Sequence, residues 1–254
     1  MSGADTMVNP QLIKLARTLG VPADQLTYLD EVPDSDLRAF RLQVADLFFE
    51  SQSEGLRRVV AASKVIPTSI IAKLVTRTRN ALFAAKTSEV LDASHAVDVA
   101  RRLPADFLAE VAAYLDARRS APMIARLSAT IVVAVAEVLA ARQDWITLGD
   151  LVATISDDAA RAAEASLDGV GLVRSAYWVD DAEHLERFVG LASASKLTEM
   201  LMAAAEHDLW SEYRPTLAVL SDAAVEAVRA AAEQLPPDQR DRALAEIDGR
   251  RSAS

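Results

Sequence analysis

Residues 103–115 read LPADFLAEVAAYL, and residues 127–139 read LSATIVVAVAEVL. Each stretch opens with leucine followed by proline or serine, and then continues as an alanine-rich apolar run. Alanine is the best helix former, and serine at a helix start accepts a hydrogen bond from an otherwise unpaired backbone N–H. The aliphatic residue in front can pack back onto the first turn. The two stretches therefore predict two helices that begin in the same way.

Similar starts recur through the second half of the chain. The predicted long helices begin near Pro104, Ser128, Ser156, Ser193 and Ser221, and short helices are expected between them. One such pair is too small to bury its own apolar face, whereas stacked pairs bury a continuous core. We therefore predict an all-α fold in which helical-hairpin repeats, about four units over residues 93–235, stack into a superhelical, solenoid-like array.

The chain is predicted to have three parts, the last two of which form one continuous domain. Residues 1–8 form a flexible tail, residues 9–92 an N-terminal helical portion packed on the array, and residues 93–249 the array with a charged capping helix. Within the N-terminal portion, apolar residues at spacings of three and four predict one helix over residues 34–63 and another over residues 67–86.

The composition excludes several classes of function. The 254 residues contain no cysteine, which rules out disulfides, thiolate metal sites and a cysteine nucleophile. No glycine-rich phosphate loop, nucleophile elbow or closely spaced histidine pair is present. We therefore expect no catalytic residue, cofactor or metal. The N-terminus lacks a secretory signal and the longest apolar run is too short for a bilayer, so a cytoplasmic protein is expected.

Charge is distributed unevenly. The formal net charge is −10, which disfavours nucleic acid as a partner. Residues 55–88, however, contain seven basic residues and no acidic one. A helix that combines apolar bulk with positive charge can lie on an anionic membrane or dock an acidic partner; alternatively, its bases pair with acids elsewhere in the chain. The contact residues expected here are Lys64, Lys73, Arg77, Arg79 and Lys86.

Five aromatic residues of the repeat region form a second candidate site. They are Trp145, Tyr177, Trp178, Trp210 and Tyr213. Either they line the concave surface or a cleft of the array, where Trp and Tyr suit recognition, or they fill gaps between the hairpins.

One segment contains several side chains that can bind metals, namely Asp180, Asp181, Glu183 and His184. The same residues suit a capped helix start, because the helix dipole favours acids in the first turn. We interpret the segment as a cap. An enzyme would require these side chains to meet a distant carboxylate in the fold.

The segment Leu103–Val111 resembles the helical repeats in the N-terminal cytosolic domain of MgtE-type magnesium transporters and, more loosely, HEAT-type arrays. The resemblance covers roughly residues 93–235 and implies a superhelical fold. The repeats are longer and less regular here, and no transmembrane region is evident in the sequence. Magnesium sensing is therefore not implied, and no residue is assigned as a metal ligand.

These observations predict two functions. The first is a non-enzymatic scaffold whose superhelix binds a protein partner. The second is a carrier of a lipid or other hydrophobic small molecule that meets an anionic membrane surface through residues 55–88, as a peripheral protein. The oligomeric state is left open.

Overall fold

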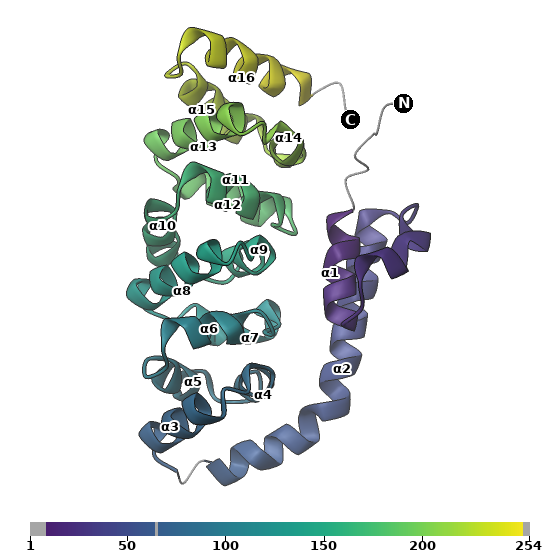
Figure 1. Ribbon diagram of the computed structural model, residues 1–254, viewed down its shortest axis with the longest axis vertical. Coiled ribbons are helices and arrows are strands. Elements are labelled where there is room, and N and C mark those ends of the chain that lie inside the picture. The colour runs from purple at the N-terminus through teal and green to yellow at the C-terminus, as the bar shows by residue number, and fades with distance from the viewer. Residues whose placement is uncertain (1–8, 64–65, 251–254) are drawn as a thin grey trace. The chain divides into compact units, whose positions relative to one another are not determined.

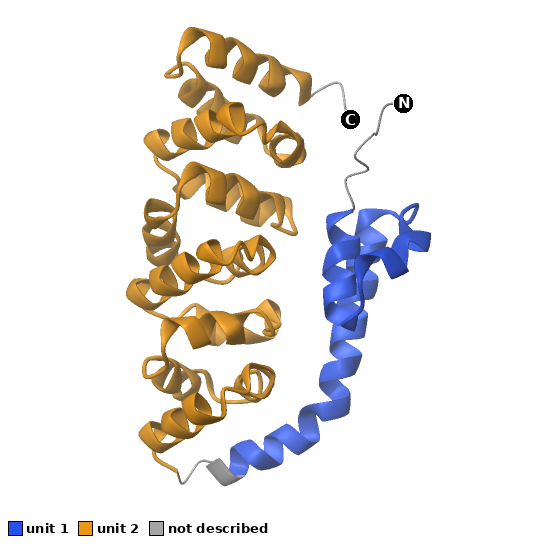
Figure 2. Cartoon of the chain, viewed as in Figure 1, with its two compact units in different colours: residues 1–64 blue, residues 65–254 orange. Residues whose placement is uncertain are grey.

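The structure is a computed structural model that describes residues 9–63 and 66–250. All regular structure in these residues is helical, in sixteen α-helices and one 3₁₀ helix. The chain divides into unit 1, residues 1–64, and unit 2, residues 65–254 (Figure 2). The all-α prediction is therefore confirmed for the described part of the chain.

The division at residue 64 falls inside the predicted N-terminal portion, residues 9–92, which contributes helices to both units. The packing of that portion on the array stays a prediction. The predicted tail, residues 1–8, lies outside the described residues.

Unit 1 consists of three helices: α1 (Pro10–Leu19), η1 (Ala23–Leu29) and α2 (Asp34–Ser63). The side chain of Asn9 caps α1 by accepting a hydrogen bond of 2.8 Å from the backbone N–H of Gln11. A small core forms where Leu12 and Leu15 of α1 meet Leu37 at the start of α2. The helix predicted over residues 34–63 is confirmed.

Unit 2 contains the remaining helices, which follow one another along the unit from α3 to α16 (Figure 1). They are α3 (Thr68–Thr78), α4 (Ala81–Ser88), α5 (Ala93–Ala100), α6 (Ala105–Ala112), α7 (Ala117–Ile124), α8 (Ala129–Ala141), α9 (Trp145–Val152), α10 (Asp157–Ser166), α11 (Gly169–Tyr177), α12 (Ala182–Leu191), α13 (Ala194–Glu206), α14 (Trp210–Val219), α15 (Asp222–Ala232) and α16 (Pro237–Gly249).

Most helices of unit 2 pack on the helix two places further along the chain. One set runs from α3 to α5 and α7; another runs from α4 through α6, α8 and α10 to α12. Further along, α9 packs on α11, α11 on α13, and α13 on α15. Most helices are thus covered by a later one, and among the described residues α3 and α4 have no earlier helix of unit 2 to cover them.

All five predicted helix starts are confirmed: Pro104, Ser128, Ser156, Ser193 and Ser221 are the N-caps of α6, α8, α10, α13 and α15. The helix at Pro104 is not a long one, because α6 has 8 residues, as α5 and α7 do. The last three serines accept a hydrogen bond from a backbone N–H of the first turn, whereas Ser128 does not. The residue types around these positions therefore locate the helix starts even where the cap hydrogen bond is missing.

The continuous helix predicted over residues 67–86 is wrong, because it ends at Thr78 and restarts as α4 at Ala81. Arg79 adopts the left-handed backbone conformation, with φ of 45°. The next residue, Asn80, caps α4 by accepting a hydrogen bond of 2.9 Å from the N–H of Phe83. Asparagine competes well with helix continuation at such a position because its side chain can satisfy the backbone.

Candidate functional site

Exposed apolar side chains are concentrated near the N-terminal end of the chain. Of the twelve large hydrophobic residues that are exposed among the described residues, ten lie between Tyr28 and Phe83. The other two are Tyr114 and Val219. Five of these ten residues lie in unit 1 and five in unit 2. Single exposed apolar residues are ordinary, whereas a contiguous patch of them marks an interaction site.

In unit 2 this concentration defines what we call the α3–α4 surface. It consists of Ile66, Ile70, Leu74, Leu82 and Phe83. Ile70 and Leu74 are four residues apart on α3 and so lie on one face of the helix, whereas Ile66 precedes the helix. The most exposed of them, Leu74, retains 60% of its accessible area.

The two helices expose these residues because their opposite faces hold them to unit 2. On α3, Ala72 is buried and Val75 packs against a core cluster that includes Phe107 of α6. On α4, Ala81 and Ala85 are buried in the same cluster. Small residues thus hold both helices to this core, and the larger apolar residues remain exposed to solvent.

Two of the predicted basic contact residues lie on this surface. Lys73 and Arg77 are exposed, one turn apart on α3. Neither forms an ion pair with any described residue. A third predicted contact residue, Lys64, lies outside the described residues.

Arg79 is held by acids of α6. Its Nη2 lies 3.0 Å from Oδ2 of Asp106 and 2.6 Å from Oε1 of Glu110. Its guanidinium carbon lies 5.4 Å from the centre of the Phe107 ring. The hydrogen bond from Arg79 lowers the pKa of the Asp106 carboxyl below its usual value. For this residue, pairing within the chain is the alternative that the geometry favours.

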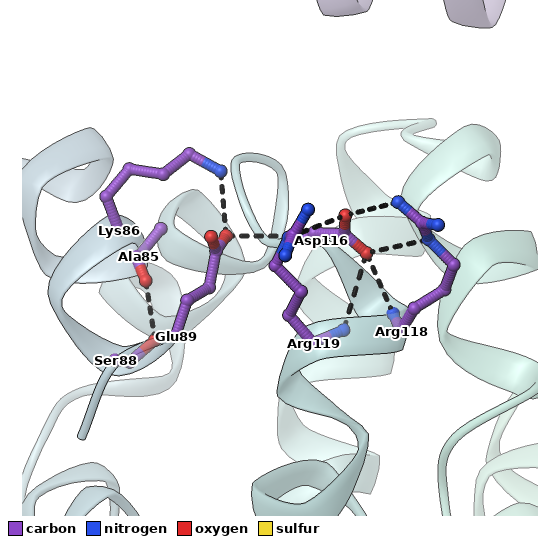
Figure 3. Close-up of polar contacts among 7 residues, drawn as sticks. All are labelled: Ala85, Lys86, Ser88, Glu89, Asp116, Arg118 and Arg119. Carbon is purple, nitrogen blue, oxygen red and sulfur yellow. Dashed lines mark hydrogen bonds and ion pairs between the residues drawn. The ribbon is translucent and has the colours of Figure 1, made fainter. Parts of the chain in front are cut away.

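Lys86 is also paired, with a carboxylate whose side chain is fully buried (Figure 3). Its Nζ lies 2.7 Å from Oε1 of Glu89, which also accepts a hydrogen bond of 3.0 Å from the backbone N–H of Asp116. These contacts join the end of α4 to the start of α7. The second oxygen of Glu89, Oε2, is buried without a hydrogen-bond partner.

Asp116 continues this polar cluster as the N-cap of α7 (Figure 3). Its carboxylate lies 2.9 Å from Nη2 of Arg118 and 3.4 Å from Nε of Arg119. Burial opposes ionisation of Asp116, but the hydrogen bond from Arg118 and the two positive charges outweigh it and lower the pKa. The opposite charges of this cluster therefore balance one another, and its contacts hold the end of α4 against the start of α7.

Two of the five candidate aromatics are buried. Trp210 and Tyr213 are only 2% and 3% exposed, and their rings form an edge-to-face pair with centroids 6.0 Å apart. Burial also raises the pKa of the Tyr213 hydroxyl. Their burial in the largest core of unit 2 favours the gap-filling alternative over a contact surface.

The other three aromatics lie half-buried near the packed helices α9 and α11. Trp145 packs on a core cluster around α8, and the guanidinium carbon of Arg174 lies 6.0 Å from its ring centre. Tyr177 and Trp178 form an edge-to-face pair with centroids 5.3 Å apart. The structure thus places these residues at helix junctions as well.

The acidic segment around Asp181 forms a helix start, as interpreted from the sequence. The carboxylate of Asp181 accepts a hydrogen bond of 3.1 Å from the N–H of His184 and lies 2.8 Å from its Nδ1. Within the described part of the chain, no group of three or more His, Cys, Asp or Glu residues could hold a metal ion.

Glu164 of α10 is a buried acid that the sequence did not single out. It is 5% exposed, and its Oε1 has no hydrogen-bond partner. Burial raises its pKa to about 7, against the opposing effect of the positive charges of Arg161, Arg187 and Lys196. These bases are engaged elsewhere: for example, Arg187 donates to the carbonyl oxygens of Val152 and Ile155.

Sequence reasoning assigned the basic residues of the α3–α4 surface as contact residues but did not assign its apolar members as such. Ile70, Leu74, Leu82 and Phe83 were expected on the apolar side of one continuous helix, and the sequence left open whether that side is buried or exposed. The available signal was Asn80, whose preference for N-caps marks the break that gives α3 and α4 separate faces.

Comparison with known proteins gave no match to a protein-family model, to a curated protein or to a solved structure. Within residues 9–63 and 66–250, no helix combines the length and the apolar character needed to cross a membrane.

Proposed function

We propose that this protein is a non-enzymatic binding protein in which unit 2 forms a solenoid-like array of helical hairpins that docks a protein partner. The observation that carries the proposal is the group of exposed apolar side chains on the first helices of unit 2, beside the bases Lys73 and Arg77, which form no ion pair with any described residue. Interfaces are typically organised around a few apolar anchors surrounded by polar residues. We therefore place the docking surface on α3 and α4 rather than on the candidate aromatics.

Affinity capture from cells that contain the protein tests this function. The bait is compared with Ile70→Asp/Leu74→Asp, which disrupts the α3–α4 surface, and with Val219→Asp, a matched control at another exposed apolar residue. The proposal predicts a specific protein that the wild type and the control retain in equal amounts and that the double variant loses.

Equal capture by all three baits would contradict the proposed surface. The carrier function is tested on the same preparation by native mass spectrometry followed by solvent extraction. A stoichiometric mass that extracts into solvent would favour a carrier of a hydrophobic molecule over a scaffold.

A further inference from the structure

The packing order of unit 2 shows what kind of element covers an apolar helix face in this fold. Inside the unit, α5 packs on α3 and α6 packs on α4, and each of those helices is covered in turn by the helix two places on. If another pair of helices preceded α3 and α4 in the stack, it would cover their outward faces. Among the described residues of unit 2, no helix precedes them.

The other end of the unit is closed by a different kind of helix. α16 buries only Ala243 and Ile247, and its remaining residues are mostly charged or polar. A polar terminal helix is what a stacked array needs to end in water. The two ends of unit 2 therefore differ in polarity. The α16 end presents mostly polar residues to water, whereas the α3–α4 end exposes apolar residues that another helix could cover.

The charges on the open end are of one sign. Arg79 and Lys86 are balanced by acids of unit 2, which leaves Lys73 and Arg77 as exposed positive charges on α3. They lie one turn apart, so both can face the flank of an element that covers Ile70 and Leu74. The surface thus combines an apolar ridge with a basic edge in a protein of formal net charge −10.

We propose that the α3–α4 surface docks an acidic amphipathic α-helix of a partner protein, which continues the helical stack. The partner helix would place its apolar face on Ile70, Leu74, Leu82 and Phe83 and its acidic residues opposite Lys73 and Arg77. Binding of amphipathic helices to apolar grooves is a general recognition mode. This inference rests on the proposed function and specifies the chemistry of the partner.

An anionic membrane is the weaker occupant for this surface. Recognition of anionic lipids usually relies on clusters of about four to eight Lys or Arg residues, whereas only two unpaired bases remain here among the described residues. A helix needs fewer charges, because apolar packing supplies most of the binding energy.

Designed peptides test the inference without knowledge of the natural partner. The probe is a helical peptide of about 18 residues with leucine at helix positions i, i+3, i+4 and i+7 and glutamate on both flanks. Its matched control carries lysine in place of glutamate. Binding to the full chain is measured by fluorescence anisotropy, and hydrogen exchange identifies the residues protected by the peptide.

We expect the glutamate peptide to bind at least about tenfold more tightly than the lysine peptide and to protect α3 and α4. Lys73→Glu/Arg77→Glu should reverse that preference. Ile70→Asp/Leu74→Asp should abolish binding of both peptides, whereas Val219→Asp should leave it unchanged. All of these residues are exposed, and circular dichroism verifies that each variant is folded.

Three results would overturn the inference. They are failure of the glutamate peptide to bind, a preference that survives charge reversal, and sedimentation of the wild type with phosphatidylglycerol vesicles in place of peptide binding. If a natural partner is captured through Ile70 and Leu74 but the peptide preference is absent, the proposed function stands and the acidic-helix inference fails.

Discussion

At the scale of single residues, Lys86 and Lys73 come from the same acid-free stretch but have different roles. Lys86 balances the fully buried side chain of Glu89, whereas Lys73 is exposed. Removing one partner of a buried pair leaves an uncompensated charge in the interior. We expect Lys86→Met to lower the free energy of unfolding by about 2–4 kcal/mol, measured by urea denaturation.

Lys73→Met is the matched control and should change the free energy of unfolding by less than about 0.5 kcal/mol. Replacing both members of the pair, as Lys86→Met/Glu89→Leu, should recover part of the loss because no buried charge remains. Equal and small effects of the two single lysine variants would refute the structural role of Lys86.

Glu164 predicts a particular pH dependence of stability. Its pKa in the folded protein is about 7, above the value of 4.5 for an ordinary glutamate, so the folded state retains the proton longer than the unfolded state. Stability should therefore fall as pH rises from about 4.5 to about 7. Glu164→Gln should remove this fall and be more stable than the wild type by about 2–3 kcal/mol at pH 8.

Urea denaturation of the two proteins from pH 4 to pH 8 measures this difference. The curves should converge at the acidic end, where Glu164 is protonated in both states. Parallel profiles across the whole range would show that Glu164 ionises without cost in the folded protein.

At the scale of elements, close approach of α9 to α11 depends on a glycine. A Cβ atom at Gly149 would lie 2.7 Å from both the carbonyl carbon and the Cβ of Trp178. Because backbone cannot move aside cheaply, Gly149→Ala should destabilise the protein by about 1–3 kcal/mol. Thermal denaturation should show a lower melting temperature.

Gly190 provides the matched control in α12, since a Cβ there meets no atom within 4 Å. Gly190→Ala should be neutral or stabilise the protein by up to about 1 kcal/mol, because alanine favours the helix. If both substitutions stabilise the protein, the close approach of α9 to α11 does not require glycine at position 149.

The helix starts were predictable because their signals are local. Ser156, Ser193 and Ser221 each accept a hydrogen bond from a backbone N–H of the following turn, so a few neighbouring residues determine the outcome. Burial was less predictable. α1 is a third as long as α2, so it covers Leu37 at the start of α2 while Phe40 and Leu47 of the same apolar stripe remain exposed. Periodicity locates an apolar face but does not say whether another element covers it.

The candidate site was only partly predictable for the same reason. The acid-free stretch drew attention to Lys73 and Arg77, which are exposed. The pairing of Arg79 with Asp106 joins residues 27 positions apart and depends on the packing of α3, α4 and α6. The aromatics Trp210 and Tyr213 were identified as an interior or a surface cluster, and only the fold shows that they are buried.

At the scale of the whole molecule, exposed apolar surface is distributed unevenly along the chain. Ten of the twelve exposed large hydrophobic residues in the described part precede Asp92, whereas the chain from Ala93 onward contributes only Tyr114 and Val219 to this set. Five of these ten lie in unit 1, and the other five form the α3–α4 surface of unit 2. Burial of apolar surface is favourable by about 25 cal/mol for each Å², which supports the proposal that a partner binds the α3–α4 surface.

Site-specific photo-cross-linking tests most directly whether a protein partner binds the α3–α4 surface. A photoreactive amino acid is placed at Leu74 in one protein and at Val219 in another, two positions of similar exposure. After irradiation in cells that contain the protein, the account predicts a discrete adduct with a second protein at Leu74 and none at Val219. Equal adducts at both positions, or none at Leu74, would contradict it.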